Sequence, residues 1–252
     1  ALAACRPDEP APTDEGVDRV EVTLEVPDHF RQPVIPPENP LTQAKIDLGK
    51  ALFFEPMLSR DSSVSCASCH LPENAFSDPR RFSLGVEDRV GKRQSMALVN
   101  LAYQRAFFWD GRASTIEEQV HFPVQDPLEM DFTVTDAARR LEGHPEYEPM
   151  FQRAFGRSAD STAVVHAIAS FERTLLSVNS KYDQFRASGN DSTVFNQAEW
   201  RGYKLFFTET SGTHAECFHC RNDPHPDVPR FCCHLSGLYR FQDYQGLARV
   251  TQ

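Results

Sequence analysis

The sequence predicts a mostly α-helical protein, built from two similar units behind a disordered N-terminal tether. Apolar residues recur at helical spacing over several segments, while strand signals are few. A short pattern occurs twice, since Leu48–Phe54 and Gly202–Phe207 each precede a Cys-x-x-Cys pair. Residues 1–40 are rich in proline and acidic side chains, a composition typical of linkers.

The composition limits the classes of function. The chain has 252 residues, of which 40% are hydrophobic and 25% are charged, as in ordinary globular proteins. Its formal net charge of −10 argues against nucleic-acid binding, which requires a basic face. No apolar run approaches the ~18 residues that a membrane-spanning helix needs.

The most informative motif is Ser65–His70, in which Cys66 and Cys69 are separated by two residues and followed directly by His70. This spacing is the attachment signature of a c-type haem. Each cysteine sulfur adds to one haem vinyl group, and the adjacent imidazole becomes the proximal iron ligand. A redox dithiol has similar spacing, but it is expected beside a βαβ pattern, and none is evident.

Helices are expected in chain order after the tether. Thr42 is a candidate N-cap for the first helix, and Thr135 for a later one. Proline and glycine punctuation between 71 and 108 indicates loops and short helices. The predicted helices cover residues 44–54, 115–120, 136–141, 145–155 and 161–176.

The repeated pattern gives the domain organisation. Gly49 lies 17 residues before Cys66, and Gly202 lies 15 residues before Cys217. Two cytochrome c-like domains explain this, the first over 41–180 and an incomplete second over 181–252, after a signal remnant and linker over 1–40. Ser188–Ser192 is a plausible surface connector between them.

The seven cysteines bear on the cellular compartment. Leu2–Cys5 resembles the end of a bacterial lipoprotein signal, which predicts Cys5 as the lipid-bearing residue; the alternative is a free cysteine in a disordered tail. A lipid would anchor the chain to a membrane without spanning it. Because c-type haem is attached after export, the expected location is the periplasm.

With these motifs in view, the chain resembles the bacterial di-haem cytochrome c peroxidases, a family that includes the MauG-type enzymes. The resemblance covers roughly residues 41–220. The matching segments are Leu48–Phe54, Ser65–His70, Asn100, Phe108–Arg112, Gln119, Pro123–Met130, Ala167–Thr174 and Gly202–Cys220.

The resemblance implies a role for each matching residue. The N-terminal haem is the peroxidatic one, with Cys66 and Cys69 as its anchors and His70 as its proximal ligand. Glu129 corresponds to the distal acid–base residue, and Gln119 to the amide beside it. Trp109 corresponds to a tryptophan between the two haems, where the alternative is an ordinary core aromatic.

These roles suit the chemistry. Cleavage of bound peroxide needs a group that removes a proton from one oxygen and returns it to the other. A carboxylate whose pKa is raised by desolvation can do both, which suits Glu129. The Gln119 amide can hydrogen-bond peroxide or orient Glu129.

One departure from the family concerns the distal histidine that leaves the iron before peroxide binds. Val86 stands where that histidine would be, and no other histidine lies between His70 and His121. We therefore expect a peroxidatic iron without a distal protein ligand, open to substrate without prior reduction.

A second departure concerns the C-terminal motif. Cys217 and Cys220 are followed by Arg221, which stays protonated and cannot ligate iron. Either residues 221–239 reflect a frame slip, or the chain is a one-haem variant; the second haem is therefore doubtful. The family also places calcium between the domains, where its asparagine ligand aligns with Gln94, so these residues do not support calcium.

The leading functional hypothesis is reduction of hydrogen peroxide to water, with electrons from a small cytochrome c or copper protein. The alternatives are MauG-type oxidation of a protein substrate and a one-haem electron carrier. Family members often dimerise, but no residue here indicates a homodimer. A zinc site is a further alternative, with the four ligands Cys217, Cys220, Cys232 and Cys233.

Overall fold

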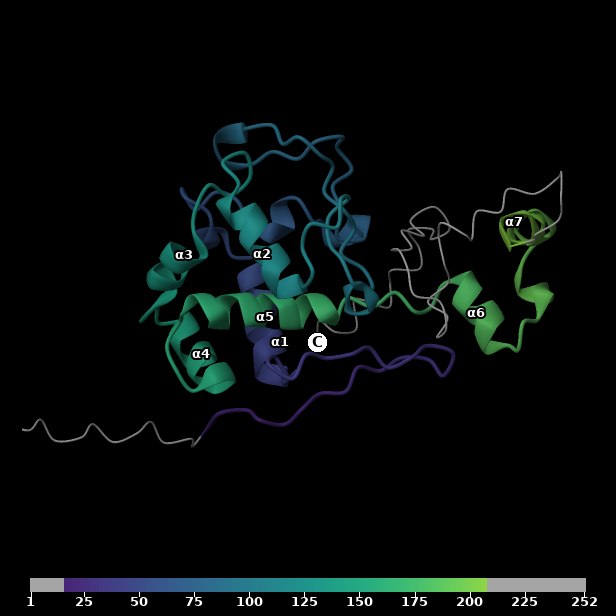
Figure 1. Cartoon of the computed structure of the whole chain (residues 1–252), viewed down its shortest axis with the longest axis horizontal. Coiled ribbons are helices and arrows are strands. Elements are labelled where there is room, and N and C mark those ends of the chain that lie inside the picture. The colour runs from purple at the N-terminus through teal and green to yellow at the C-terminus, as the bar shows by residue number, and fades with distance from the viewer. Residues whose placement is uncertain (1–15, 208–252) are drawn as a thin grey trace, which may run out of the picture.

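The protein was analysed as a computed structural model that describes residues 16–207, and within this part it is mostly helical (Figure 1). Only isolated β-bridges accompany the helices in the described range, which confirms the predicted mostly α class. The α-helices are α1 (Gln43–Phe53), α2 (Ile116–Gln125), α3 (Val134–Leu141), α4 (Tyr147–Phe155), α5 (Ser161–Arg173), α6 (Lys181–Ala187) and α7 (Gln197–Phe207).

Local sequence signals fix most helix starts. The side chain of Thr42 accepts a hydrogen bond from the amide of Lys45 at the start of α1, as predicted. Two expectations were wrong in detail. The N-cap of α3 is Thr133, not Thr135, and α2 continues to Gln125 instead of ending near residue 120. The helix continues because its buried face outweighs the bond lost at Pro123.

Helices α1 and α5 form the centre of the helical unit built from α1 to α5. Figure 1 shows α5 crossing its middle in front of α1, with α2 and α3 on one side and α4 on the other. A Cβ atom on Gly49 of α1 would overlap the carbonyl oxygen of Ala167 on α5. Glycine at this position therefore permits close backbone contact between the two helices.

The prediction of a disordered tether over residues 1–40 is wrong for the second half of this range. The amide of Asp18 donates to the Arg153 carbonyl, and that of Val22 to the Leu41 carbonyl, both at 2.8 Å. Leu24 is buried in a small apolar cluster, and Asn39 is fully buried. Proline sets an extended path here, and the segment is ordered because its apolar side chains find partners on the domain.

The predicted second domain is described only as far as residue 207. Helices α6 and α7 lie beyond the C-terminal end of α5 (Figure 1). Aromatic rings pack between them, including Phe185 against Tyr203 with ring centroids 5.1 Å apart. Within residues 16–207, no helix combines the length and apolar character needed to cross a bilayer. The predictions for Cys5, Cys217, Cys220, Arg221, Cys232 and Cys233 lie outside the described residues.

Replacing Gly49 with alanine tests the close contact between α1 and α5. Gly49→Ala should lower the free energy of unfolding by about 1–3 kcal/mol or more, because the methyl group would force the helices apart. Gly202→Ala is the matched control, since no heavy atom of the described residues lies within 4 Å of the added methyl group. Urea unfolding should show the control unchanged or stabilised, and equal losses in both variants would contradict the packing account.

Candidate haem site

A single cavity brings together five of the residues that the sequence singled out. Its lining includes Cys66, Cys69, His70, Gln119 and Glu129. Segments between residues 64 and 98 form most of its wall, and α2, the turn after α2 and α5 complete it. Apolar side chains separate the polar groups. Residues far apart in sequence thus meet in one pocket of the kind that holds a cofactor.

A tight turn arranges the Cys-x-x-Cys-His motif. Residues Cys66–Ser68 form a short 3₁₀ helix, and the Ser65 amide donates to the Ser68 hydroxyl at 3.0 Å. The amides of Cys69 and His70 both donate to the carbonyl of Cys66. This compact turn presents both sulfur atoms and the imidazole to the same cavity, as covalent haem attachment requires.

The imidazole of His70 is oriented for ligation. Its Nδ1 lies 2.8 Å from the carbonyl oxygen of Phe76, which can only accept, so Nδ1 carries the proton in the neutral ring. Nε2 then keeps a free lone pair for a metal. Desolvation lowers the pKa of His70, which further favours the neutral ligand form.

The environment of the two thiols is unlike that of a redox dithiol. Burial raises the pKa of Cys66, and the nearby Glu172 carboxylate adds to the shift. Burial also raises the pKa of Cys69. Redox-active dithiols instead have a lowered thiol pKa in an electropositive setting. The direction of these shifts is therefore opposite to that expected of a redox dithiol.

Gln119 and Glu129 reach the cavity from α2 and from the turn that follows it. Pro123 lies between them in the helix. Desolvation raises the pKa of Glu129, Asp126 raises it further, and Arg112 opposes both. The Glu129 residue also meets solvent at the cavity mouth. A carboxylate with a raised pKa at the mouth of the cavity is suited to proton transfer.

The loop of residues 83–91 closes over the segment that carries Glu129. The amide of Val86 donates to the carbonyl of Glu129 at 2.8 Å, and the Val86 side chain is fully buried. A Cβ atom on Gly85 would overlap the carbonyl oxygens of Leu128 and Glu129. The position that would hold a distal histidine is therefore an apolar anchor between this loop and the acid-bearing segment.

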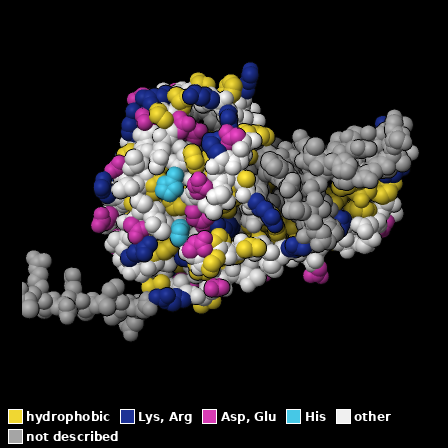
Figure 2. All heavy atoms as spheres, in the orientation of Figure 1, with side chains coloured by type: hydrophobic (Ala, Val, Ile, Leu, Met, Phe, Trp, Pro, Cys, Tyr) yellow, Lys and Arg dark blue, Asp and Glu magenta, His cyan; other side chains and the backbone are white. Residues whose placement is uncertain are grey.

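Charged side chains hold the same loop from outside. The carboxylate of Asp131 accepts from Arg60 at 2.7 Å and from Arg89 at 2.9 Å. Arg89 also donates to the carbonyl of Pro127 at 2.8 Å. These partly exposed pairs contribute modestly one by one, but together they tie the loop to the turn after α2. Figure 2 shows acidic and basic side chains interspersed on the visible face of the domain.

Trp109 and Gln94 lie outside the cavity. Trp109 is 58% exposed, and its indole nitrogen donates to the backbone carbonyl of Gln94 at 3.5 Å. The Gln94 amide donates to the Asp78 carbonyl at 3.2 Å. Among the residues described, no group of three or more His, Cys, Asp or Glu is arranged to hold a metal ion. The predicted interhaem role of Trp109 thus stays a prediction.

Glu172 also lines the cavity, although no role was predicted for it from the sequence. It is 4% exposed on α5, and desolvation raises its pKa to about 8. A signal was present in the sequence. Glu172 follows Val165, Ile168 and Ala169 at helical spacing on the apolar face of the predicted helix, where an acid is unusual.

The helical domain and its Cys-x-x-Cys-His cavity define a cytochrome c-type class of protein. The sequence matches the family of di-haem cytochrome c peroxidases over residues 43–192, and the chain belongs to this family. It is 41% identical to the methylamine utilization protein MauG of Methylorubrum extorquens over 182 residues, covering 70% of this chain and 51% of the relative. It is 35% identical to the cytochrome c551 peroxidase of Nitrosomonas europaea, covering 71% and 51%.

Solved structures agree with this assignment. A MauG-like protein associated with microbial copper homeostasis matches with a TM-score of 0.71 and 29% identity, over 79% of this chain and 58% of that protein. The di-haem peroxidase BthA of Burkholderia thailandensis matches with a TM-score of 0.61 and 25% identity, over 80% and 56%. The chain spans about half the length of the curated relatives named above.

Replacing Gly85 with alanine tests the close contact between the 83–91 loop and the Glu129 segment. Gly85→Ala should lower the free energy of unfolding by about 1–3 kcal/mol, because the methyl group would overlap two backbone carbonyls. Gly91→Ala, in the same loop, meets its nearest atom at 3.4 Å and should be tolerated. Denaturant titration of both variants provides the comparison, and a fully stable Gly85→Ala protein would contradict the close approach.

Proposed function

We propose that this cavity holds a c-type haem and reduces hydrogen peroxide to water. The observation that carries the proposal is the meeting of Gln119 and Glu129 with Cys66, Cys69 and His70 in one cavity. A plain electron carrier needs no acid and amide beside its iron. Two thiols at the attachment spacing and an imidazole with Nε2 available fit the group that the family implies.

When bound, the haem supplies the iron at which peroxide is reduced. Glu129 removes the proton from the nearer peroxide oxygen and returns it to the departing oxygen, which leaves as water. Gln119 hydrogen-bonds the substrate or holds the carboxylate in position. The apolar walls from α2 and α5 restrict water in the cavity and strengthen these interactions. The net reaction consumes one peroxide, two electrons and two protons and yields two waters.

The electrons come from a small cytochrome c or a copper protein in this proposal. Trp109 is exposed on the domain surface, a location compatible with electron passage toward a second haem at Cys217 and Cys220. Arg221 leaves that second haem without its usual proximal ligand. Export to the periplasm follows from covalent haem attachment, while the lipid at Cys5, the calcium ion and the homodimer stay predictions.

A MauG-type oxidation of a protein substrate is the second candidate. The 41% identity to a MauG protein and the buried Val86 in place of a distal histidine favour it. Both candidates use the same cavity and the same proton-transfer residues. They differ in the electron source, which is a redox protein in one case and an oxidisable protein side chain in the other.

Substitution of Glu129 tests the proposed acid–base role. Glu129→Gln should lower kcat for peroxide reduction by about 10²–10⁴-fold while the haem absorption spectrum is retained, because the amide cannot transfer the proton. Glu118→Gln is the matched control, since Glu118 bonds Ser114 on the exposed side of α2 and does not line the cavity. Steady-state assays with a small one-electron donor give the comparison, and an active Glu129→Gln enzyme would refute the role.

The identity of residue 86 predicts the spin state of the first haem. With a buried valine in place of the distal histidine, the oxidised protein should show a high-spin ferric signal before any reduction. Electron paramagnetic resonance and visible absorption of the oxidised protein measure this directly. A wholly low-spin first haem would mean that another side chain occupies the distal position.

A further inference from the structure

Glu172 is a buried acid in the wall of the candidate haem cavity, and one of its two carboxyl oxygens has no hydrogen-bonding partner among the described residues. Its residue is 4% exposed on α5, and it lines the cavity together with Cys66 and Ile168. The Oε2 atom is buried and accepts or donates no hydrogen bond within residues 16–207. A buried carboxyl oxygen without a partner costs free energy, so its retention in this position points to a ligand.

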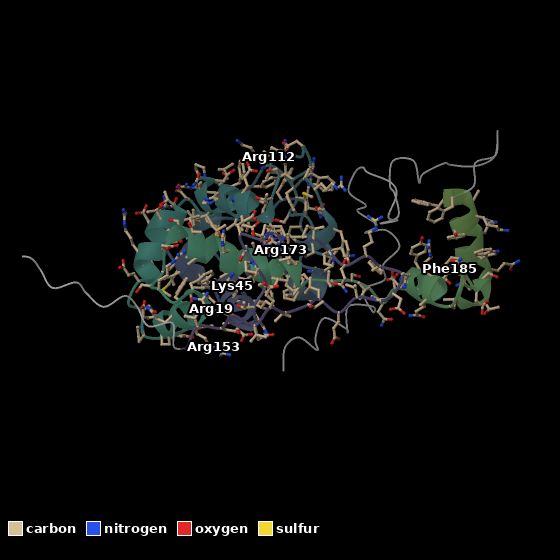
Figure 3. The ribbon with its side chains drawn as sticks, turned by 60° about the horizontal axis from the view of Figure 1, so that its bottom comes forward. Arg19, Lys45, Arg112, Arg153, Arg173 and Phe185 are labelled. Atoms are coloured by element: carbon tan, nitrogen blue, oxygen red, sulfur yellow. The ribbon has the colours of Figure 1, made fainter. Side chains whose placement is uncertain are left out.

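The basic residue beside it serves another carboxylate. Arg173 forms two hydrogen bonds with Glu117, at 2.7 and 2.8 Å, and Asn39 donates to the same carboxylate at 2.9 Å. Figure 3 shows Arg173 in the interior of the domain, near its middle. Arg173 still attracts the negative charge of Glu172, and Glu117 repels it. Because both of these Arg173 hydrogen bonds go to Glu117, Glu172 lines the cavity without a hydrogen bond from Arg173.

The other titratable groups that line the cavity have different tasks. Cys66 and Cys69 become thioethers when haem is attached, and His70 becomes an iron ligand. The guanidinium of Arg93 pairs with Asp110 at 2.8 Å and keeps its charge. Glu129 lies at the solvent-exposed mouth. Of the groups lining this cavity, Glu172 is thus the buried one that stays free to bind or release a proton.

A change in the charge of the iron changes the pKa of a buried carboxyl group beside it. Reduction of the iron removes one positive charge from a cavity with a mostly apolar lining. The ionised form of a nearby carboxyl group is then less stable, and its protonated form is favoured. Burial, with a further contribution from Glu117 and against the attraction of Arg173, raises the pKa of Glu172 to about 8, so a nearby change of charge acts on a carboxyl group that already titrates near neutrality.

We propose that Glu172 takes up one proton when the haem iron of this cavity is reduced and releases it when the iron is oxidised. In the forward step, a one-electron reductant such as dithionite or a small redox protein converts ferric to ferrous iron, while the Glu172 carboxylate gains a proton from solvent. The charge of the cavity is then conserved. This inference rests on the proposed haem site, but it does not depend on peroxide turnover.

The test is the midpoint potential of the first haem in the full-length holoprotein, measured by spectroelectrochemical titration across neutral and alkaline pH. The wild-type potential should fall with rising pH, by up to about 59 mV per unit where one proton accompanies one electron. Glu172→Gln stays neutral and should lose this dependence, whereas Glu118→Gln, on the exposed side of α2 and outside the cavity, should keep it. An equal slope in Glu172→Gln, or a wild-type potential independent of pH, would overturn the inference.

A second measurement uses the wild-type protein alone. The reduced-minus-oxidised infrared difference spectrum should contain the carbonyl band of a newly protonated carboxylic acid, shifted in deuterated water. Absence of that band would overturn the inference even if Glu172→Gln did not fold. Failure of the proposed haem site has a different signature, since the protein would then lack the haem absorption that both measurements use.

Discussion

The close contact between α1 and α5 is the constraint on which the rest of the domain depends. Gly49 allows the backbones of α1 and α5 to come into contact at Ala167. This contact fixes the position and direction of both helices. Helix α1 ends at Phe53, and a loop with one short 3₁₀ helix leads from it to the turn that carries the Cys-x-x-Cys-His motif, while α5 brings Ile168 and Glu172 to the cavity wall. A larger residue at position 49 would shift the two walls of the cofactor site against each other.

The site combines two acids in contrasting surroundings. Glu129 lies at the mouth, on a turn held by the 83–91 loop, where it can exchange protons with solvent and substrate. Glu172 lies in the wall with an unpartnered oxygen. Burial raises the pKa of both groups, but only the first is accessible for turnover. Both residues are glutamates, so it is their positions that differ in function: Glu129 is placed to transfer protons to peroxide, and Glu172 is placed for proton uptake linked to the iron.

Much of the fold and of the candidate haem site could be predicted from the sequence, for physical reasons. The haem motif depends on fixed covalent spacing, and the mostly helical class and most helix positions follow from periodicity and capping residues. The ordered path of residues 18–42 was not predictable, because proline-rich composition resembles a linker unless the partners of Leu24 and Asn39 are known. Neither was the role of Glu172, since burial and a missing partner are properties of the folded chain.

The central claim is that the cavity formed by the Cys66–His70 turn, α2 and α5 holds a covalently attached haem. The haem-to-protein ratio of the exported protein, measured by the pyridine haemochrome assay, tests it most directly when wild type is compared with the Cys66→Ser, Cys69→Ser double variant. The account predicts that the double variant carries one covalent haem fewer per chain. An unchanged ratio, or a wild-type protein without covalent haem, would contradict it.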